Sequence, residues 1–283
     1  MDKPIAIFGC GYYGMELTKL LNHDILCFID NHIIDGTIVE GLRVYNLPHF
    51  LEEFETRNII IGSMNFYAEI KAQLNAIGIT EIPCLNLSST KLTQYFDLPQ
   101  LFHAENEVFI DGGGLDGESS LNFLKWSEGH SKARKILIFE PSVKSAEVCE
   151  ETLKGVNVDW VVIRKGLFDK AGTQCFQTCP QSPHQATIRS NGETIIEVDA
   201  LDNICYNDHP TFIKLDIEGA ESKAIEGMKH IIRDYKPKLA ICVYHKPHDV
   251  WSIPLEVKEI RNDYSFYLRH YSMLACETVL YAV

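Results

Sequence analysis

Short apolar runs alternate with amphipathic helical patterns along most of this chain, and that alternation limits the fold more than any other feature. Each run is apolar along its whole length, as in strands buried on both faces of a sheet. Buried strands that alternate with helices form a parallel sheet covered by helices, so the sequence predicts an α/β protein. In the first part of the chain we expect strands at 5–8, 25–29 and 58–62, helices at 15–21, near 49–55 and at 67–76, and turns around 36–41.

The alternation stops and then restarts, which predicts two domains. Residues 93–106 have no strong period and include Pro99, so we expect a linker there between a smaller Rossmann-like domain at 1–92 and a larger domain at 107–283. The larger domain has expected strands at 108–111, 135–140, 158–164, 212–216, 239–244, 265–269 and 277–282, expected helices at 119–126, 143–153, 221–233 and 255–262, and shorter β-like runs at 174–178, 187–189 and 194–198. Its last two strands have no helix between them.

The first strand of the larger domain ends in an acid and a glycine-rich turn, and a helix begins near Ser119. Glycines there let the backbone come close to a ligand, and nucleotide-like ligands bind across the carboxyl ends of parallel strands. A tight turn without a ligand would show the same pattern. The residues that we expect to contact a cofactor in this loop are Asp111, Gly112, Gly113, Gly117, Glu118 and Ser119.

The second strand of the larger domain ends in Glu140, immediately before Pro141. A carboxylate at this point can accept hydrogen bonds from both hydroxyls of a ribose. It follows the glycine loop by about the expected 20 residues. The structural alternative is a carboxylate that caps the next helix, and the two roles can coexist.

Charged residues crowd the end of the strand at 212–216 and the start of the following helix. Acids at a helix N-terminus are electrostatically favourable, and capping explains Glu221 better than it explains Lys214 or Asp216. Because buried charges are costly, such a cluster at a strand end more often marks a site. Asp216 and Glu218 are therefore candidate catalytic residues, and Asp216 is also a candidate cofactor contact. They point to opposite sides if the strand continues through both, unless the backbone turns between them.

These residues resemble the FkbM-type methyltransferases. The resemblance runs through the glycine loop, Phe139-Glu140-Pro141, Lys214-Leu215-Asp216-Ile217-Glu218-Gly219-Ala220-Glu221 and Val243-Tyr244-His245-Lys246-Pro247-His248-Asp249-Val250-Trp251, over about residues 105–283. It implies a class I methyltransferase fold, S-adenosylmethionine as methyl donor, and O-methylation of a sugar, glycan or nucleotide-sugar hydroxyl. Gly114 departs from the family, in which a small residue such as alanine is more usual there.

Methyl transfer to a hydroxyl needs alignment of donor and acceptor and removal of the acceptor's proton. His245 follows the fifth large strand and is our first choice for the general base, because an unperturbed imidazole titrates near physiological pH. A buried structural histidine is the alternative. Asp216, Glu218, His245 and Asp249 could instead bind a divalent metal that lowers the pKa of the acceptor, although we expect no metal.

The smaller domain has its own glycine motif between a strand and a helix. Asp30 ends its second strand, and this context strengthens a motif that is weak by itself. The segment resembles the small nucleotide-sugar-binding domain that precedes some bacterial sugar acyltransferases. We expect nucleotide-sugar binding first, a scaffold or dimer interface second, and NAD binding third. The expected nucleotide-binding residues are Gly9, Gly11, Tyr12, Gly14 and Asp30.

Composition limits the partners. The net charge is −13 at pH 7, which argues against binding to the phosphates of nucleic acid. The N-terminus does not resemble a signal peptide, and no apolar run is long enough to span a bilayer, so we expect a cytoplasmic protein with a small-molecule or glycan acceptor. Two other functions stay open: a nucleotide-sensing protein with two Rossmann-like modules, and an NAD-dependent sugar-nucleotide oxidoreductase. A homodimer is also open.

Overall fold

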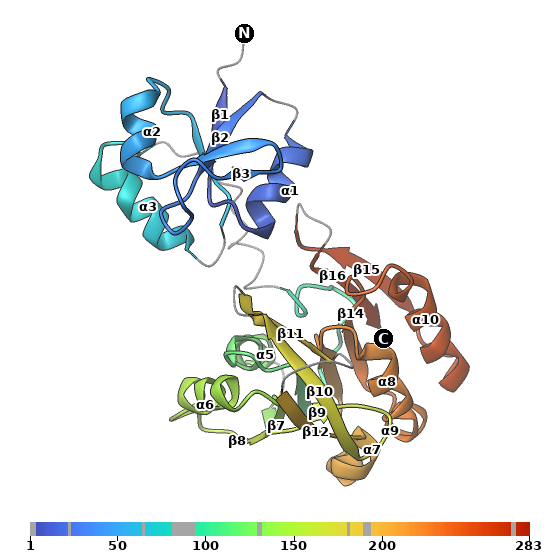
Figure 1. The fold of residues 1–283 in the computed structure, drawn as a ribbon. Coiled ribbons are helices and arrows are strands. Elements are labelled where there is room, and N and C mark those ends of the chain that lie inside the picture. Colours follow the sequence, from blue (N-terminus) through green and yellow to red (C-terminus); the bar gives the residue numbers. More distant parts are fainter. Residues whose placement is uncertain are drawn as a thin grey trace. The chain divides into compact units, whose positions relative to one another are not determined.

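The structure is a computed structural model with two compact units, Met1–Ser88 and Ser89–Val283. Figure 1 labels their elements. The structure describes residues 4–21, 24–63, 66–80, 94–128, 132–179, 182–188, 194–272 and 276–283. Each unit has its own sheet and its own hydrophobic clusters.

The N-terminal unit is a small α/β unit around one mainly parallel sheet. Its elements are β1 (Ile5–Phe8), α1 (Tyr12–Leu20), β2 (Ile25–Ile29), β3 (Ile38–Val39), β4 (Leu42–Tyr45), α2 (Leu47–Glu53), β5 (Ile59–Ile61) and α3 (Tyr67–Ala76). The strand order is β3-β4-β2-β1-β5, and only β3 runs antiparallel to its neighbour. The expectation of turns alone around 36–41 missed β3 and β4. Only Val44 and Tyr45 of β4 are buried, so the strand is too short to show a period.

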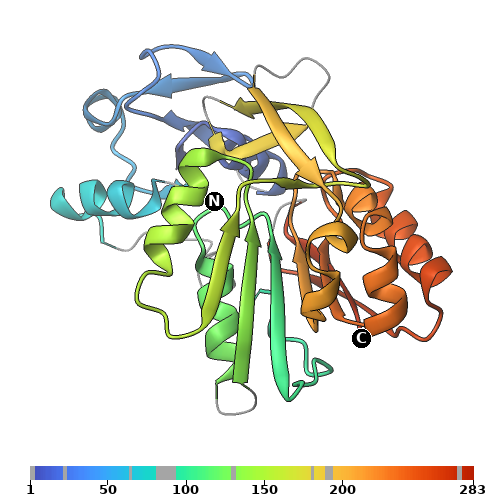
Figure 2. The same ribbon diagram turned by 90° about the horizontal axis from the view of Figure 1, so that it is seen from below.

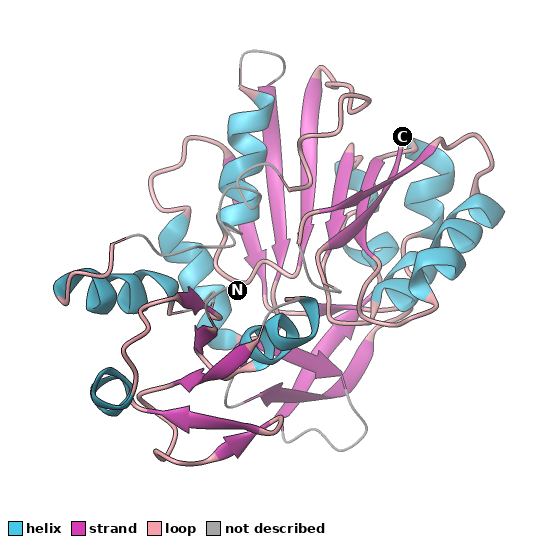
Figure 3. Ribbon diagram, turned by 90° about the horizontal axis from the view of Figure 1, so that it is seen from above, coloured by secondary structure: helices cyan, strands magenta, loops and turns pink. Residues whose placement is uncertain are grey.

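The C-terminal unit is built on a larger, seven-stranded sheet. Its elements are β6 (Asn106–Gly112), α5 (Glu118–Ser127), β7 (Lys132–Phe139), α6 (Val143–Thr152), β8 (Asp159–Ile163), β9 (Gly166–Leu167), β10 (Gly172–Cys179), β11 (Ser182–Ile188), β12 (Thr194–Asp199), α7 (Leu201–Ile204), β13 (Phe212–Leu215), α8 (Glu221–Glu226), α9 (Lys229–Tyr235), β14 (Lys238–Cys242), α10 (Asp249–Ile260), β15 (Phe266–His270) and β16 (Thr278–Ala282). The strand order is β15-β16-β14-β13-β6-β7-β8. All pairings are parallel except those of β16. The expected α/β fold, with a parallel sheet that ends in an antiparallel pair, is confirmed (Figure 3).

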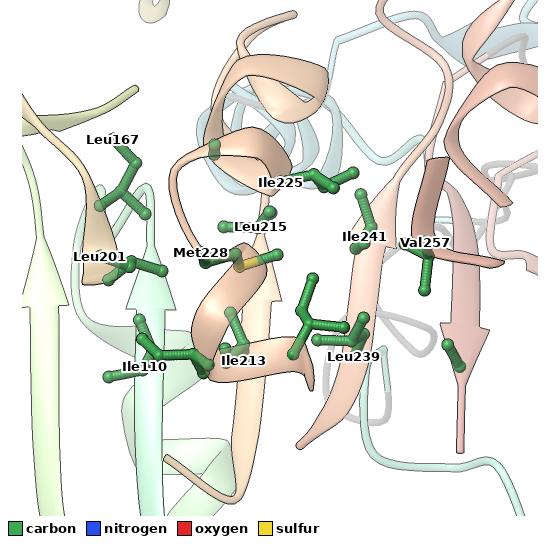
Figure 4. Packing of buried hydrophobic residues seen from close by; sticks show 14 of the residues in the cluster. Ile110, Leu167, Leu201, Ile213, Leu215, Ile225, Met228, Leu239, Ile241 and Val257 are labelled. Carbon is green, nitrogen blue, oxygen red and sulfur yellow. The ribbon is translucent and has the colours of Figure 1, made fainter. Parts of the chain in front are cut away.

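Helices cover both faces of this sheet because its strands are apolar on both sides. On one face, Ile110, Ile213 and Leu239 point toward Ile225 and Met228 from the α8–α9 segment (Figure 4). On the other face lie α5, α6 and the segment that precedes β6, where aromatic rings dominate. Phe109 and Phe123 stack there with ring centroids 4.4 Å apart. Replacing such a buried ring with alanine costs about 3–5 kcal/mol. The long strands β6, β7 and β8 lie side by side in Figure 2.

Two expectations for the C-terminal unit are wrong in detail. The segment expected as a linker is part of this unit from Gln94 onward, because Tyr95 and Phe96 pack into the aromatic cluster beside the sheet. The single helix expected at 221–233 is two helices, α8 and α9. Gly227 is the C-cap of α8, and a side chain there would place its Cβ 2.0 Å from the backbone oxygen of Phe168, so only glycine fits between the two helices.

A separate four-stranded sheet is inserted between β8 and β13. Its order is β11-β10-β12-β9, and β10 pairs antiparallel with both β11 and β12. The runs expected at 174–178 and 194–198 lie within β10 and β12, whereas the run expected at 187–189 covers only the last two residues of β11, and position 189 lies outside the described residues. The two-residue strand β9 and the short helix α7 were not expected, since neither is long enough to show a hydrophobic period.

Candidate active site

The strand order of the C-terminal unit places a switch point at β6. The chain proceeds from β6 to β7 on one side and returns to β13 on the other. In open α/β sheets, ligands bind outside the carboxyl ends of the strands at such a point. The loop after β6 passes very close to the end of β13. A Cβ at Gly113 would lie 2.0 Å from the backbone oxygen of Asp216, and Gly113 has a φ of +81°, so only glycine fits.

A buried ion pair between Lys214 and Asp111 holds the loop after β6 in place. Lys214 Nζ lies 3.0 Å from Asp111 Oδ1 and donates to the backbone oxygen of Gly113 at 2.7 Å. Ser119 and Ser120 donate to Asp111 Oδ2 at 2.6 and 2.7 Å. The Asp111 side chain is fully buried. In this structure Asp111 therefore positions the loop, and a direct cofactor contact would require some of these bonds to break.

Gly112 ends β6. The three remaining residues that we expected to contact the cofactor, Gly117, Glu118 and Ser119, lie at the start of α5. Gly117 is the N-cap of this helix with a φ of +79°, and Glu118 is exposed in the first turn. The glycine at position 114, which was expected to be of no consequence, does matter, because the Cβ of an alanine there would lie 2.2 Å from Ile138 Cγ2.

Glu140 lies at the tip of β7, beside the glycine loop. Its Oε2 accepts from the backbone nitrogen of Leu115 at 3.0 Å, and its Oε1 accepts from that of Ser142 at 2.8 Å. The residue is only 7% exposed, and burial raises the pKa of its carboxyl. Each oxygen keeps capacity for another donor. Glu140 thus supports the loop and can still bind hydroxyl groups.

Four side chains from the ends of β13 and β14 and the start of α8 form an acid–His cluster, which consists of Asp216, Glu218, Glu221 and His245. His245 Nδ1 lies 2.9 Å from Glu221 Oε1, and its Nε2 lies 3.4 Å from Asp216 Oδ1 and 3.6 Å from Glu218 Oε2. Since β13 ends at Leu215 and the chain then turns, both Asp216 and Glu218 face His245 rather than opposite sides. Glu221, expected as a capping residue, also accepts from the backbone nitrogen of Ile217 at 3.0 Å.

Two tyrosines complete the surroundings of Asp216, and the sequence analysis missed both. Tyr95 donates to Asp216 Oδ2 at 3.0 Å, and Tyr244 donates to Oδ1 at 3.2 Å. Tyr244 directly precedes His245, which could have drawn attention to it. Tyr95 lies far away in the sequence, inside the segment expected to be a linker, and no local pattern identifies it.

Comparison with known proteins decides the family. Residues 116–270 match the model of the methyltransferase FkbM domain, which is more than half of the chain. The chain belongs to the FkbM methyltransferase family. It is thus an S-adenosylmethionine-dependent methyltransferase, and the alternatives of a nucleotide sensor and an NAD-dependent oxidoreductase are set aside. Residues 1–83 match a second model, C2185-like, N-terminal, and no curated protein matches the chain.

One solved structure has the same fold, and two others are more distantly similar. A crystal structure of methyltransferase FkbM from Methylobacillus flagellatus KT superposes with a TM-score of 0.62 at 20% identity, covering 99% of this chain and 90% of that one. An O-methyltransferase from Bacillus cereus in complex with SAH has a TM-score of 0.38 at 12% identity and covers 83% of this chain and 96% of its own. Aeropyrum pernix fibrillarin with bound S-adenosyl-L-methionine has a TM-score of 0.41 at 11% identity, with coverage of 70% and 74%.

The charges of the acid–His cluster are strongly coupled. Burial by itself would lower the pKa of His245, but the Glu221 carboxylate and the charges of Asp216 and Glu218 outweigh it and raise the pKa to about 9. Burial raises the pKa of Glu218 to about 7. For Asp216, burial is opposed by the positive charges of Lys214 and His245, and its pKa is lowered. At neutral pH this FkbM methyltransferase holds a protonated imidazole among carboxylates.

Within the part of the chain that the structure describes, no three His, Cys, Asp or Glu side chains are arranged to hold a metal ion. Asp249, named above as a possible ligand, is buried at the start of α10 and accepts from the backbone nitrogen of Lys246 at 3.2 Å. Over the same described residues, no helix is long and apolar enough to cross a membrane.

The glycine motif of the N-terminal unit also lies at a switch point, between β1 and β5. A Cβ at Gly14 would lie 1.9 Å from the backbone oxygen of Gly9, so α1 approaches the end of β1 closely. Asp30 Oδ2 accepts from the backbone nitrogen of Cys10 at 3.3 Å. Gly11 is the N-cap of α1, with open space where a side chain would be, and Tyr12 begins the helix and is 45% exposed.

Proposed function

We propose that the C-terminal unit transfers the methyl group of S-adenosylmethionine to a hydroxyl of a sugar, glycan or nucleotide sugar. The observation that carries this proposal is the arrangement at the carboxyl edge of one sheet. The glycine loop after β6 and Glu140 after β7 lie on one side of the switch point, and the acid–His cluster after β13 and β14 lies on the other. Donor and acceptor would meet between them.

The residues at the donor side fit an adenosine-containing molecule. Gly113 and Gly117 adopt φ values of +81° and +79°, which let the loop turn tightly between β6 and α5, and the start of α5 presents Glu118 and Ser119. Glu140 would accept hydrogen bonds from the ribose hydroxyls with its remaining lone pairs. When bound, S-adenosylmethionine supplies an electrophilic methyl group on a sulfonium. Asp111 would not contact the cofactor directly. It would hold the loop in position through its contacts with Lys214 and Ser119.

The acceptor side suits a neutral hydroxyl. Carboxylates and tyrosine hydroxyls form hydrogen bonds with sugar hydroxyl groups, and the acid–His cluster contains three candidates for the proton acceptor, His245, Asp216 and Glu218. The contact between Gly113 and the backbone of Asp216 supports this assignment, because it brings the cluster against the loop that would hold the donor.

We propose that the N-terminal unit binds a nucleotide sugar at Gly9, Gly11, Tyr12, Gly14 and Asp30. The switch point between β1 and β5 and the contact of Asp30 with the glycine loop support it. Such a unit would recruit the acceptor or an analogue of it, and a homodimer through this unit is the alternative. The cytoplasm is the proposed compartment, because S-adenosylmethionine and nucleotide sugars are available there.

The direct test uses the full chain. Calorimetry should detect S-adenosylmethionine binding, and mass spectrometry should detect S-adenosylhomocysteine and a methylated product with UDP-hexoses or dTDP-hexoses. Caffeic acid serves as a non-sugar control acceptor. Methylation of caffeic acid but of no hexose would overturn the acceptor class, whereas lack of donor binding would overturn the proposal as a whole.

A further inference from the structure

The contacts of His245 leave neither ring nitrogen directed at an acceptor. Nδ1 faces Glu221, and Nε2 faces the carboxylates of Asp216 and Glu218 at 3.4 and 3.6 Å. The imidazole is only 8% exposed, and the Glu221 side chain behind it is wholly buried. An acceptor hydroxyl that reached Nε2 would have to displace two carboxylates that lie on that side of the ring.

Of the carboxylates that face Nε2, Glu218 is the better proton acceptor. Asp216 accepts hydrogen bonds from Tyr95 and Tyr244. The effect of burial on the Asp216 carboxyl is opposed by the positive charges of Lys214 and His245, which lower its pKa and make it a weaker base. Among the described residues no N–H or O–H group donates a hydrogen bond to Glu218, and its contact is the ion pair with His245. Its side chain is 32% exposed, against 25% for Asp216. The Glu218 carboxylate can therefore exchange a proton with solvent.

The backbone holds Glu218 in this place. Glu218 has a φ of +56°, in the left-handed region that side chains other than those of glycine, asparagine and aspartate seldom adopt. Gly219 follows with a φ of +94°, and Lys246 donates to its backbone oxygen from the β14 side. A strained residue persists only where the surrounding structure fixes it, and such residues gather at functional sites.

We propose that Glu218, rather than His245, removes the proton of the acceptor hydroxyl, and that His245 and Glu221 form a buried positioning pair that holds a positive charge beside it. This inference rests on the proposed methyl transfer. The acceptor oxygen forms a new bond to the methyl carbon as the methyl–sulfur bond breaks and its electron pair passes to sulfur. The hydroxyl proton passes to the Glu218 carboxylate and then to solvent, which restores the enzyme.

The charges around Glu218 agree with this division of roles. Burial raises its pKa to about 7, the positive charge of His245 opposes the rise, and Asp216, Glu221 and Glu277 add to it. A base whose pKa lies near the working pH is ionised in a large fraction of the molecules and still binds a proton strongly enough to remove it from the acceptor. His245, with a pKa of about 9, keeps its proton at pH 7.5 and cannot accept another.

Nuclear magnetic resonance of the full chain with bound S-adenosylhomocysteine tests the roles without an acceptor. In 15N-histidine spectra, His245 should carry protons on both ring nitrogens at pH 7.5, in the wild type and in Glu218→Gln. In 13C-glutamate spectra, the carboxyl of Glu218, identified by its absence in Glu218→Gln, should titrate near pH 7. His245→Asn should move that midpoint to higher pH, since the opposing positive charge is lost.

Glu226→Gln is the matched control. Glu226 lies on the same helix as Glu221, but it is exposed and its only described ion pair is with Lys229. Its loss should leave the titration of Glu218 and the donor affinity unchanged. With UDP-glucose as the probe acceptor, Glu218→Gln should lower kcat by about 100- to 10,000-fold. Glu226→Gln should not, and His245→Asn should move the acidic limb of the kcat profile to higher pH.

A neutral imidazole at His245 at pH 7.5 with the cofactor product bound would overturn this inference, as would a Glu218 carboxyl that titrates at an ordinary value near 4.5. Both readings are made on the wild type, and the variants serve only to assign the two signals. Where a variant folds poorly, sequential assignment of the wild-type spectra identifies the signals instead, so a decision is still reached. Failure of the proposed function is a different result, namely no binding of S-adenosylmethionine by the wild type.

Discussion

The two units use the same hydrogen-bond pattern around their glycine loops. In each, the carboxylate at the tip of the second strand accepts one backbone N–H from the glycine loop and one from the residue two positions after itself. Asp30 accepts from Cys10 and from His32 at 3.3 and 2.9 Å. Glu140 accepts from Leu115 and Ser142 at 3.0 and 2.8 Å. Both loops lie at the switch point of a parallel sheet.

The units differ in what lies across the switch point. In the N-terminal unit, β5 ends at Ile61 and is followed by Gly62 and Ser63, neither of which is ionisable. In the C-terminal unit, β13 carries Lys214 beneath the loop and leads into the acid–His cluster. The comparison separates two features that local sequence patterns do not distinguish. Both units have a glycine loop and a strand-tip acid, but among the described residues only the C-terminal unit also places charged groups at the end of the strand across the switch point.

The largest expected effect concerns the ion pair that only the C-terminal loop has. Lys214→Met leaves Asp111 buried without its partner, so the free energy of unfolding of that unit should fall by about 3–5 kcal/mol. Lys223→Met removes an exposed pair with Asp169 and should cost about 1 kcal/mol or less. Guanidinium unfolding followed by tryptophan fluorescence measures this unit alone, because all three tryptophans lie in it. Equal losses in the two variants would contradict the role of the pair.

The second effect is a pH dependence that the acid–His cluster gives to the C-terminal unit. The pKa of His245 is raised from 6.5 to about 9 in the folded protein, so its stabilisation is fully present below pH 6.5 and is lost as pH rises through 9. The loss should amount to about 3 kcal/mol. The raised pKa of Glu218 acts in the same direction between pH 4.5 and 7.

Unfolding at pH 6.5 and 9.5, followed by tryptophan fluorescence, measures how much of the free energy of unfolding depends on the protonation of His245. The variant His245→Asn is the control. Stability in that variant should change less over the same interval. In the N-terminal unit, the Asp35 carboxyl has a pKa lowered by His49, which matters only in acid. A wild-type C-terminal unit as stable at pH 9.5 as at 6.5 would show that His245 is not held protonated.

The third effect compares the two strand-tip acids. Glu140→Ala should weaken S-adenosylmethionine binding about 10- to 100-fold, since charge-assisted hydrogen bonds contribute about 1.5–3 kcal/mol. Asp30→Ala should leave that affinity unchanged, because Asp30 belongs to the other unit. Calorimetry on the full chain measures both. Unchanged affinity in Glu140→Ala would remove the ribose assignment, and a loss in Asp30→Ala would show that the two sites are coupled.

The smallest expected effect concerns Gly11. Its φ is −73°, and a Cβ there would meet nothing within 4 Å, so Gly11→Ala should change the stability of the N-terminal unit by less than about 0.5 kcal/mol. If a nucleotide sugar lies against this loop, the added methyl should still weaken UDP-glucose binding. Circular dichroism and calorimetry measure the two properties. Intact binding of UDP-glucose would argue that the loop does not touch it.

Much of the fold could be read from local patterns. The strands β1 and β2 are continuous apolar runs, and β6, β7 and β14 contain such runs after polar first residues, so their burial on both faces follows from that composition. Elements without a period were missed or misjudged. The strand β4 is too short, and the break between α8 and α9 depends on the approach of Phe168 to Gly227, which no sequence window contains.

The sequence by itself determined which residues stand at the carboxyl ends of the strands. Glycine-rich loops, strand-tip acids and the charged run after β13 are encoded within a few residues, because hydrophobic period and backbone freedom are local properties. The tertiary structure decided which of these groups meet and which remain charged. Tyr95 reaches Asp216 across 121 positions of sequence, and Glu221 faces His245 only because β14 lies beside β13. Charge states depend on such contacts and on burial, since both change the electrostatic free energy of an ionised group, and neither is fixed until the chain has folded.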